Sequence, residues 1–351
     1  MKFGTLRKFF ITAALAAVVG VSASATACSI ETKRPRARIT FELVTGDTAE
    51  EYVLDYDLYR NLYPNTVNHF IELAKAGYYD NTVIHDYETG EWYTGMYSYD
   101  KDAYSAAVSG DSGSVGEYFA NHSKESEYLN LFNDGKIKPT VYANTLFKTD
   151  KNGNIVYVDK DGKTVSGDTL GASPVRVISK DYAMPSLIGE FKNNVQQTIN
   201  NGALTATAGS LKMFYYPSNS SDNASKSKVY VTPPKSGILQ ADSKYNCATS
   251  AFTVQVGAST NAESNYCVFG KVRNQDDLDD LKNAVADYFE DTYGSNSYVV
   301  KSSDVAVTVY EPTAGWKPSA GGKCYNARTV EEVFDAPKSA IRIVSVKITK
   351  N

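Results

Sequence analysis

The chain has little material for histidine-based chemistry, with three histidines among 351 residues. Histidine is the commonest general base and metal ligand near neutral pH, so such chemistry is not expected. Basic charge is not in excess either, because 36 Lys and Arg face 40 Asp and Glu. A nucleic-acid partner is therefore not expected. The sequence also lacks G-x-S-x-G, Walker, H-E-x-x-H and C-x-x-C motifs, and we expect no cofactor and no metal.

Long hydrophobic runs are absent apart from one near the N-terminus. Phe9 to Val21 is an apolar run of 13 residues, too short to span a bilayer as a mature helix. Three basic residues precede it: Lys2, Arg7 and Lys8. Small residues, Ala25-Thr26-Ala27, follow it. This order is typical of a signal peptide over residues 1–27.

Cys28 follows the small residues directly, and the segment resembles a bacterial lipobox. Ala25 stands where the lipobox usually has Leu. The resemblance implies a lipid on Cys28 and an anchor on the outer face of the bacterial cytoplasmic membrane. Ordinary secretion is the alternative. Residues 28–38 are then a short basic tether, which would lie against anionic headgroups.

Three cysteines remain after Cys28, namely Cys247, Cys267 and Cys324. Their odd number allows at most one intrachain disulfide, and their spacing fits no zinc motif. A disulfide and simple burial stay open as alternatives.

Alternating patterns predict that the rest of the chain is mainly β. Ile39, Phe41 and Leu43 predict a strand, followed by a turn at Thr45-Gly46-Asp47 and a second strand through 52–56. Two helices interrupt the strands, one over about 64–77 and one from near Asp276. Their apolar positions have helical spacing: Val67, Phe70, Ile71 and Ala74 in the first, and Leu278, Leu281, Val285 and Tyr288 in the second.

A closing strand is predicted by Ile341, Ile343, Val346 and Ile348, with an irregularity near Val344. From Tyr97 to about Pro185 the pattern is looser. There, Asp150–Gly153 and Asp159–Gly162 predict polar hairpin turns. The second turn lacks the spacing and the closing Glu of a calcium loop.

The run from Pro64 to Thr82, PNTVNHFIELAKAGYYDNT, resembles the cyclophilin segment PNTVxNFxxLxxxGYYDGTxFHR. Val268–Val272, VFGKV, resembles a second cyclophilin segment, which precedes that family's second helix. Weaker matches follow the family's order: 188–191, 202–206, 250–252 and 341–348. The resemblance implies an eight-stranded antiparallel barrel with two capping helices, built from residues 39–351. Insertions are expected at about 97–185, 210–247 and 303–338.

The family activity is peptidyl-prolyl cis–trans isomerisation, by an apolar proline pocket and an arginine that donates toward the prolyl nitrogen. The resemblance places Asp86 at the arginine position, and a carboxylate cannot donate. The other family positions also carry different residues: Glu91, Trp92, Thr94, Ala251, Thr253 and Tyr266, with Ala208 at a backbone-binding asparagine. His85 and Asp86 are adjacent, so a dyad between them is not expected.

Two functions stay open at this point. The resemblance implies an exported isomerase or foldase that acts on proline-containing peptides or unfolded exported proteins. The replaced residues favour weak or lost activity, with a peptide- or partner-binding surface module as the alternative. Four residues are candidates for a binding groove: Trp92, Tyr93, Phe252 and Tyr266. A cation from an insertion, such as Arg176 or Lys180, could replace the arginine. We expect a monomer.

Overall fold

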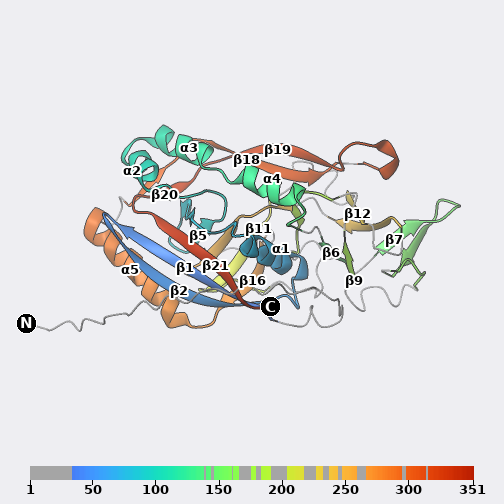
Figure 1. Cartoon of the computed structure of the whole chain (residues 1–351), viewed down its shortest axis with the longest axis horizontal. Coiled ribbons are helices and arrows are strands. Elements are labelled where there is room, and N and C mark those ends of the chain that lie inside the picture. The colour runs from blue at the N-terminus through green and yellow to red at the C-terminus, as the bar shows by residue number, and fades with distance from the viewer. Residues whose placement is uncertain are drawn as a thin grey trace, which may run out of the picture. The chain divides into compact units, whose positions relative to one another are not determined.

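A curled antiparallel sheet is the centre of the fold (Figure 1). The computed structural model describes residues 34–137, 140–143, 146–159, 161–165, 175–178, 183–190, 204–216, 227–231, 237–243, 247–258, 266–294, 298–313 and 315–351. The sheet has the order β3-β21-β1-β2-β16-β11-β15-β5-β4. Its strands are β1 (Arg36–Thr45), β2 (Thr48–Leu58), β3 (Thr82–Val83), β4 (Asp86–Tyr87), β5 (Glu91–Thr94), β11 (Ser210–Phe214), β15 (Phe252–Gln255), β16 (Tyr266–Val272) and β21 (Ile341–Lys350).

The two edge strands, β3 and β4, are consecutive pieces of one segment, 82–87. Within it, the Ile84 N–H donates to Ile341 O at 2.8 Å on one side. The His85 N–H donates to Tyr93 O at 3.0 Å on the other. Counted as one bent strand, this segment joins both ends of the sheet and gives eight strands. The fold is thus mainly β and consistent with the expected barrel.

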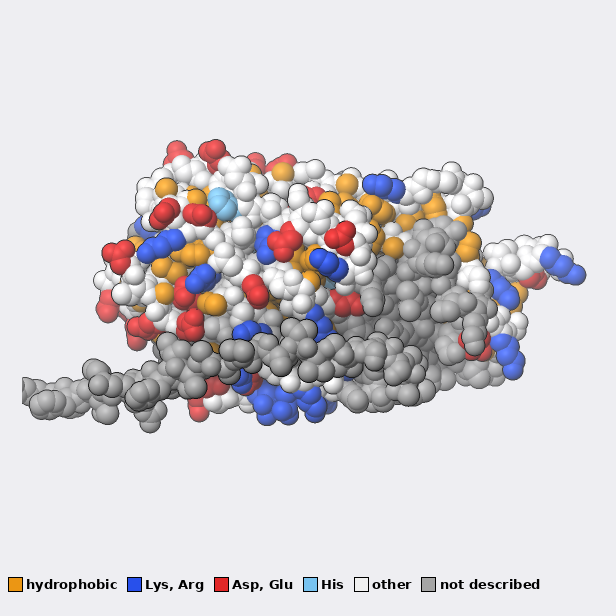
Figure 2. Space-filling model, in the orientation of Figure 1, with side chains coloured by type: hydrophobic (Ala, Val, Ile, Leu, Met, Phe, Trp, Pro, Cys, Tyr) orange, Lys and Arg blue, Asp and Glu red, His pale blue; other side chains and the backbone are white. Residues whose placement is uncertain are grey.

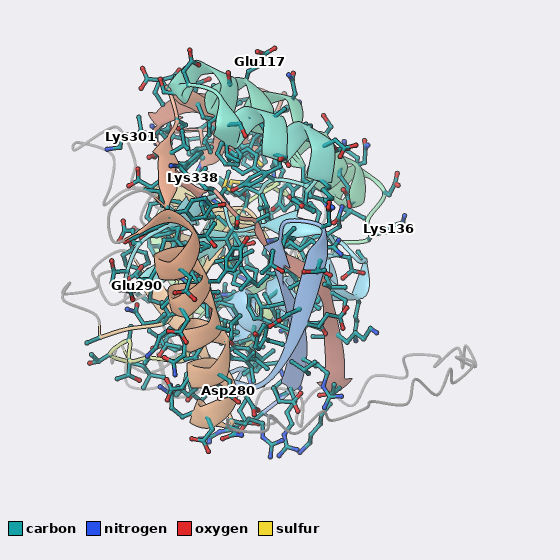
Figure 3. The ribbon with its side chains drawn as sticks, turned by 90° about the vertical axis from the view of Figure 1, so that its left-hand side faces the viewer. Glu117, Lys136, Asp280, Glu290, Lys301 and Lys338 are labelled. Atoms are coloured by element: carbon teal, nitrogen blue, oxygen red, sulfur yellow. The ribbon has the colours of Figure 1, made fainter. Side chains whose placement is uncertain are left out.

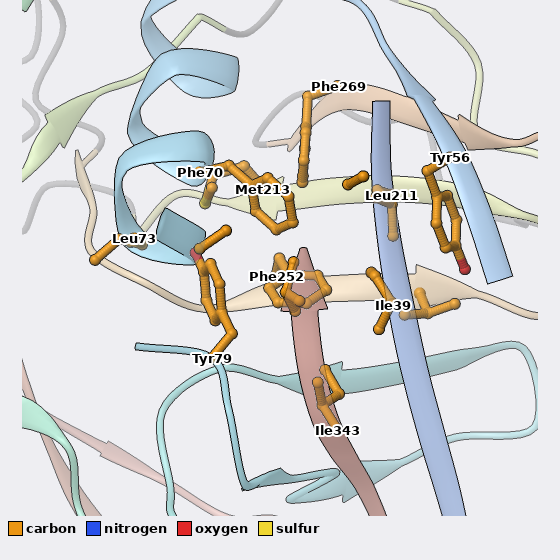
Figure 4. Close-up of a cluster of buried hydrophobic side chains, with 14 of the residues drawn as sticks. Ile39, Tyr56, Phe70, Leu73, Tyr79, Leu211, Met213, Phe252, Phe269 and Ile343 are labelled. Atoms are coloured by element: carbon orange, nitrogen blue, oxygen red, sulfur yellow. The ribbon is translucent and has the colours of Figure 1, made fainter. Parts of the chain in front are cut away.

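Two helices add their apolar sides to the barrel core, α1 (Pro64–Lys75) and α5 (Gln275–Tyr293). Phe70 of α1 lies 5.4 Å from the ring of Phe252 and 5.0 Å from that of Phe269 (Figure 4). Leu278, Leu281 and Val285 of α5 are fully buried. Asp280 and Glu290 lie on the solvent side of α5 (Figure 3). Both helices form where the apolar spacing predicts them.

The structure confirms the predicted ends of α1, the first hairpin turn and the irregularity in the last strand. Pro64 begins α1, and Gly77, just beyond its end, has φ +74°. The hairpin of β1 and β2 turns at Gly46, φ +65°, as the sequence predicts. The register of β21 on β1 slips at Val344, since Thr40 pairs with Ser345 and Phe41 with Ile343. This bulge keeps both Ile343 and Val346 buried.

Two predicted boundaries were wrong. β1 begins at Arg36, so Arg36 and Arg38 are strand residues instead of tether. They pair with Asp57 and Asp55 on β2, at 3.0 and 2.9 Å. The second insertion does not begin at 210, because residues 210–214 form β11, one of the strands of the barrel. The insertion follows this strand. Leu204–Ala206, matched to the family's strand, forms no strand, and Ala208 lies in the turn before β11.

The first insertion contains three helices that the sequence analysis missed: α2 (Lys101–Ser109), α3 (Ser112–Asn121) and α4 (Glu125–Asn133). Asp100 and Asp111 cap the first two, accepting the N–H groups of Ala103 and Ser114. These helices are short, and α3 contains two glycines, which weakens a helical pattern. The caps were the signal that could have found them.

The insertions also contribute small sheets and hairpins. β12 (Ser227–Val231), β13 (Leu239–Ser243), β7 (Leu146–Thr149) and β8 (Ile155–Val158) form one sheet in that order. The remaining pairs are β6 (Thr140–Ala143) with β9 (Val175–Ile178), β10 (Leu187–Ile188) with β14 (Cys247–Ala248), β17 (Val299–Lys301) with β20 (Asp335–Pro337), and β18 (Val305–Pro312) with β19 (Tyr325–Glu332); Pro318–Ala320 is a short 3₁₀ helix. Both predicted polar turns are confirmed, since Asp150 and Asp159 each accept two backbone N–H groups.

The cysteine alternatives stay open. Cys267 is buried in the barrel core, and the Cys324 thiol donates to Ala183 O at 3.6 Å. The side chain of Cys247 lies outside the described residues. In the described part of the chain, no helix is both long and apolar enough to cross a bilayer.

Glu190 fixes the start of α1. Its buried carboxylate accepts hydrogen bonds from the backbone N–H groups of Asn65 and Thr66 and from both of their side chains, at 2.8 to 3.2 Å. The two backbone N–H groups are among those that have no partner within the helix at its first turn. Burial raises the pKa of Glu190 to about 8, although the hydrogen bonds from Asn65 and Thr66 act to lower it.

We predict that Glu190→Ala lowers the free energy of unfolding by about 3 kcal/mol, because it removes the buried acceptor that four hydrogen-bond donors share. Urea unfolding would measure the change. Glu117→Ala, on the exposed side of α3 (Figure 3), is the matched control and should change stability by under about 0.5 kcal/mol. An equal, small effect of both changes would contradict the role of Glu190.

Candidate functional site

The position of the family's arginine lies in one register row on the outer face of the sheet. Asp86 of β4 pairs with Tyr93 of β5, Tyr93 with Thr253 of β15, and Thr253 with Lys212 of β11. Directly paired residues of antiparallel strands share a face. The row therefore brings Asp86, Tyr93, Thr253 and Lys212 to the same side of four neighbouring strands.

Lys212 is the cation of this row, although its side chain is only 1% exposed. Its ammonium group lies 2.5 Å from Glu91 Oε1 and 4.4 Å from the ring centroid of Tyr266. The second oxygen of Glu91 accepts the hydroxyl of Tyr93 at 3.1 Å. Three family positions, Glu91, Thr253 and Tyr266, thus do come together, around a lysine. A buried pair of this kind is costly to break.

Asp86 fastens an insertion to the barrel. Its Oδ1 accepts the backbone N–H of Asp335 on β20 at 2.9 Å. β20 is held in turn by β17, and the Phe334 N–H donates to Ser302 Oγ at 2.9 Å. The third insertion therefore lies against the strand that carries the arginine position. An arginine side chain has no hydrogen-bond acceptor. It could not accept the Asp335 N–H as the carboxylate of Asp86 does.

Burial raises the pKa of Asp86 to about 6. The N–H of Asp335 opposes this shift, and the nearby carboxylates of Glu88, Asp335 and Glu332 add to it. Burial also raises the pKa of Glu88 and of Glu332. The surroundings of Asp86 are thus acidic, opposite in charge to the family's site.

Two of the predicted groove residues are wrong as groove candidates. Trp92 is 1% exposed and Phe252 fully buried, because both point into the barrel core. Trp92 stacks on Tyr87 at 5.7 Å. Thr94 also points inward and donates to Val83 O, while Ala251 is buried just before β15. Tyr93 and Tyr266 stay partly exposed on the outer face.

His85 is excluded from acid–base work by its surroundings. It packs edge-on against Tyr97 and Phe334, each 4.9 Å away, in the contact between the barrel and the insertions. Burial lowers its pKa to about 3, so the ring is neutral at physiological pH. The expectation that His85 and Asp86 form no dyad agrees with this packing.

Lys212 is the residue that the sequence analysis missed. Its signal was the alternation of Leu211, Lys212 and Met213, with both apolar neighbours fully buried. The resemblance instead places this segment in the insertion expected at 210–247. Of the cations proposed there, Arg176 has no described side chain and Lys180 lies outside the described residues. In the part of the chain that the structure covers, no group of three His, Cys, Asp or Glu residues could hold a metal ion.

Comparison with known proteins supports this interpretation of the barrel. Residues 40–167 match the family model of the cyclophilin type peptidyl-prolyl cis-trans isomerase/CLD. The match is to a cyclophilin-type domain. It covers just over a third of the chain, from within β1 through α1 and β5 to β8 of the first insertion. Strands β11, β15, β16 and β21 of the same sheet lie beyond the matched residues. No curated protein matches the chain.

We predict that Asp86→Asn stabilises the protein at pH 8 by about 1 to 2 kcal/mol, allowing for solvent screening. The folded-state pKa of about 6 is raised, so the stability from protonated Asp86 is complete below pH 4 and lost as pH rises through 6. Asparagine keeps an acceptor for the Asp335 N–H without the charge.

Urea unfolding at pH 4.5 and pH 8 would test this, with the gain shrinking at the lower pH. Asp304→Asn, at an exposed aspartate of the same insertion, is the control. A pH-independent difference would contradict the buried-charge account.

Proposed function

We propose that this chain is an exported cyclophilin-type protein that has lost prolyl isomerase activity and binds a peptide or surface partner. The observation that carries the proposal is the contact of Asp86 with β20, in which the carboxylate accepts a hydrogen bond from the Asp335 N–H. A substrate proline needs a donor toward its nitrogen and an open apolar pocket. Asp86 supplies an acceptor, and an insertion occupies the space beside it.

The pocket position supports the same conclusion. Glu91 stands where the resemblance places a pocket phenylalanine, and its carboxylate is held by Lys212 and Tyr93. Inserting a proline ring there would have to separate a buried ion pair. Breaking such a pair costs about 3 to 5 kcal/mol, which is comparable to the binding energy of a weak peptide.

Lys212 supports one competing function, which is retained isomerisation with a lysine in place of the arginine. It lies in the same register row as Asp86 and carries a positive charge. Against this, its ammonium group already contacts Glu91 and the ring of Tyr266. A donor engaged in this way is poorly placed to bond a prolyl nitrogen.

We predict that the full chain, purified in mild detergent, does not accelerate cis–trans exchange of a proline-containing peptide above the uncatalysed rate. Exchange alone takes tens to hundreds of seconds, so a tenfold acceleration is easily measured by peptide NMR. An active cyclophilin is the positive control.

Acceleration of tenfold or more would overturn the proposed loss of activity. Lys212→Met would then identify the donor, since its loss of activity would assign the role to Lys212. Activity unchanged by both Lys212→Met and Asp86→Asn would place the site elsewhere. Thermal unfolding of each variant would show that it is folded.

We further propose that the protein is held at the outer face of the cytoplasmic membrane by a lipid on Cys28. In a bacterial host, Cys28→Ser should move the protein from the membrane fraction to the soluble extracytoplasmic fraction. Ser29→Ala is the matched control. If Cys28→Ser stays with the membrane, the anchor is wrong.

A further inference from the structure

A small hollow lies where two insertions meet the barrel. The hollow itself has a volume of about 30 Å³, and the space around it at the open mouth brings the total to about 380 Å³. Glu125 and Tyr128 of α4 form one wall, and Thr308 and Tyr310 of β18 form another. Tyr78 and Tyr97 of the barrel side complete it. The pocket shares no residue with the row from Asp86 to Lys212.

Glu125 is the charged group of this pocket. Its two carboxylate oxygens accept the hydroxyls of Tyr310 and Thr308, at 2.5 and 2.9 Å. Both donors are neutral and come from one strand, so the carboxylate is oriented by them and its charge is not cancelled. Among the described residues, no cation forms an ion pair with Glu125.

The adjacent lysine is engaged elsewhere. Lys124 donates to Tyr78 O at 2.5 Å and pairs with Glu127 at 3.0 Å. Its ammonium group lies 4.8 Å from the ring centroid of Tyr78. Because Lys124 already occupies the Tyr78 ring, a ligand cation would contact the other tyrosine rings of the wall, Tyr97, Tyr128 and Tyr310.

Carboxylates add negative charge around the pocket, beside the ammonium group of Lys124. Burial is the main cause of the raised pKa of both Tyr78 and Tyr97. Nearby carboxylates add to both shifts, Glu127 and Glu125 at Tyr78 and Glu332 and Glu125 at Tyr97. Figure 2 shows acidic side chains gathered over α2, α3 and the adjacent end of α5. Exposed members of this group are Asp100, Asp102, Asp111 and Glu117. Such a surface attracts cations and repels anions.

We propose that this pocket binds a primary ammonium group on an alkyl chain, as carried by a lysine side chain. The Glu125 carboxylate pairs with the ammonium group, and the tyrosine rings with Met96 and Val307 contact the methylenes. The proposal does not depend on whether the barrel isomerises proline.

The test compares two short peptides on the full chain by ligand-observed NMR and calorimetry. One is an acetylated, amidated Gly-Lys-Gly, and the other carries an Nε-acetylated lysine, which has the same stem without charge. The unmodified peptide should bind at least tenfold more tightly. A third peptide, Gly-Gly-Gly with a free amino terminus, separates an amino-terminal source from a side-chain source.

Glu125→Gln should lower the affinity for the lysine peptide at least tenfold, while Glu117→Gln makes the same charge change on α3 and should leave it unchanged. Equal affinity for both lysine peptides, or unchanged affinity in Glu125→Gln, would overturn the proposal. Should Glu125→Gln fail to fold, the comparison of the two peptides on the unaltered chain still decides.

Discussion

The closure of the sheet through residues 82–87 is the constraint on which the rest of the structure depends. One short segment bonds to Ile341 on one side and to Tyr93 on the other. Because side chains alternate along each strand, closure divides every barrel residue into an inner or an outer one. The inner set is aromatic and aliphatic and packs around Phe70 and Phe252. The outer set is therefore the one that can change without loss of the core.

The insertions contact the outer face, where residues can be replaced without loss of the core. β20 bonds to Asp86, and α2 and α3 pack with β18 and Phe334 in a second cluster around His85 and Tyr97. An outer face that is open to a peptide does not need buried side chains, whereas an outer face covered by its own chain must satisfy every polar group it buries. The pairs Lys212–Glu91 and Asp86–Asp335 supply such partners, whereas the hydroxyl of Thr253 in the same row has none among the described residues. The replaced site residues can thus be understood as the polar partners of a covering insertion.

The sequence predicted those parts that local pattern determines. The hairpin at Gly46, helices α1 and α5, and the slip at Val344 each follow from spacing or turn chemistry within a few residues. Lys212 could not be assigned in that way, because its role depends on which strands β11 lies between. The coverage of Asp86 by Asp335 joins residues 249 positions apart. No local signal specifies such a contact.

The pocket at Glu125 follows from the same long-range packing. α4 and β18 belong to different insertions, and neither forms a concave surface alone, so the pocket exists only because both are fastened to one barrel. Its carboxylate is oriented by hydroxyls of β18, which ties the position of the charge to the docking of that strand. A barrel whose outer face is covered can still carry a binding site, but that site has to be built from the covering segments. The chemistry to be expected of this protein is therefore that of its insertions, with the barrel as the frame that positions them.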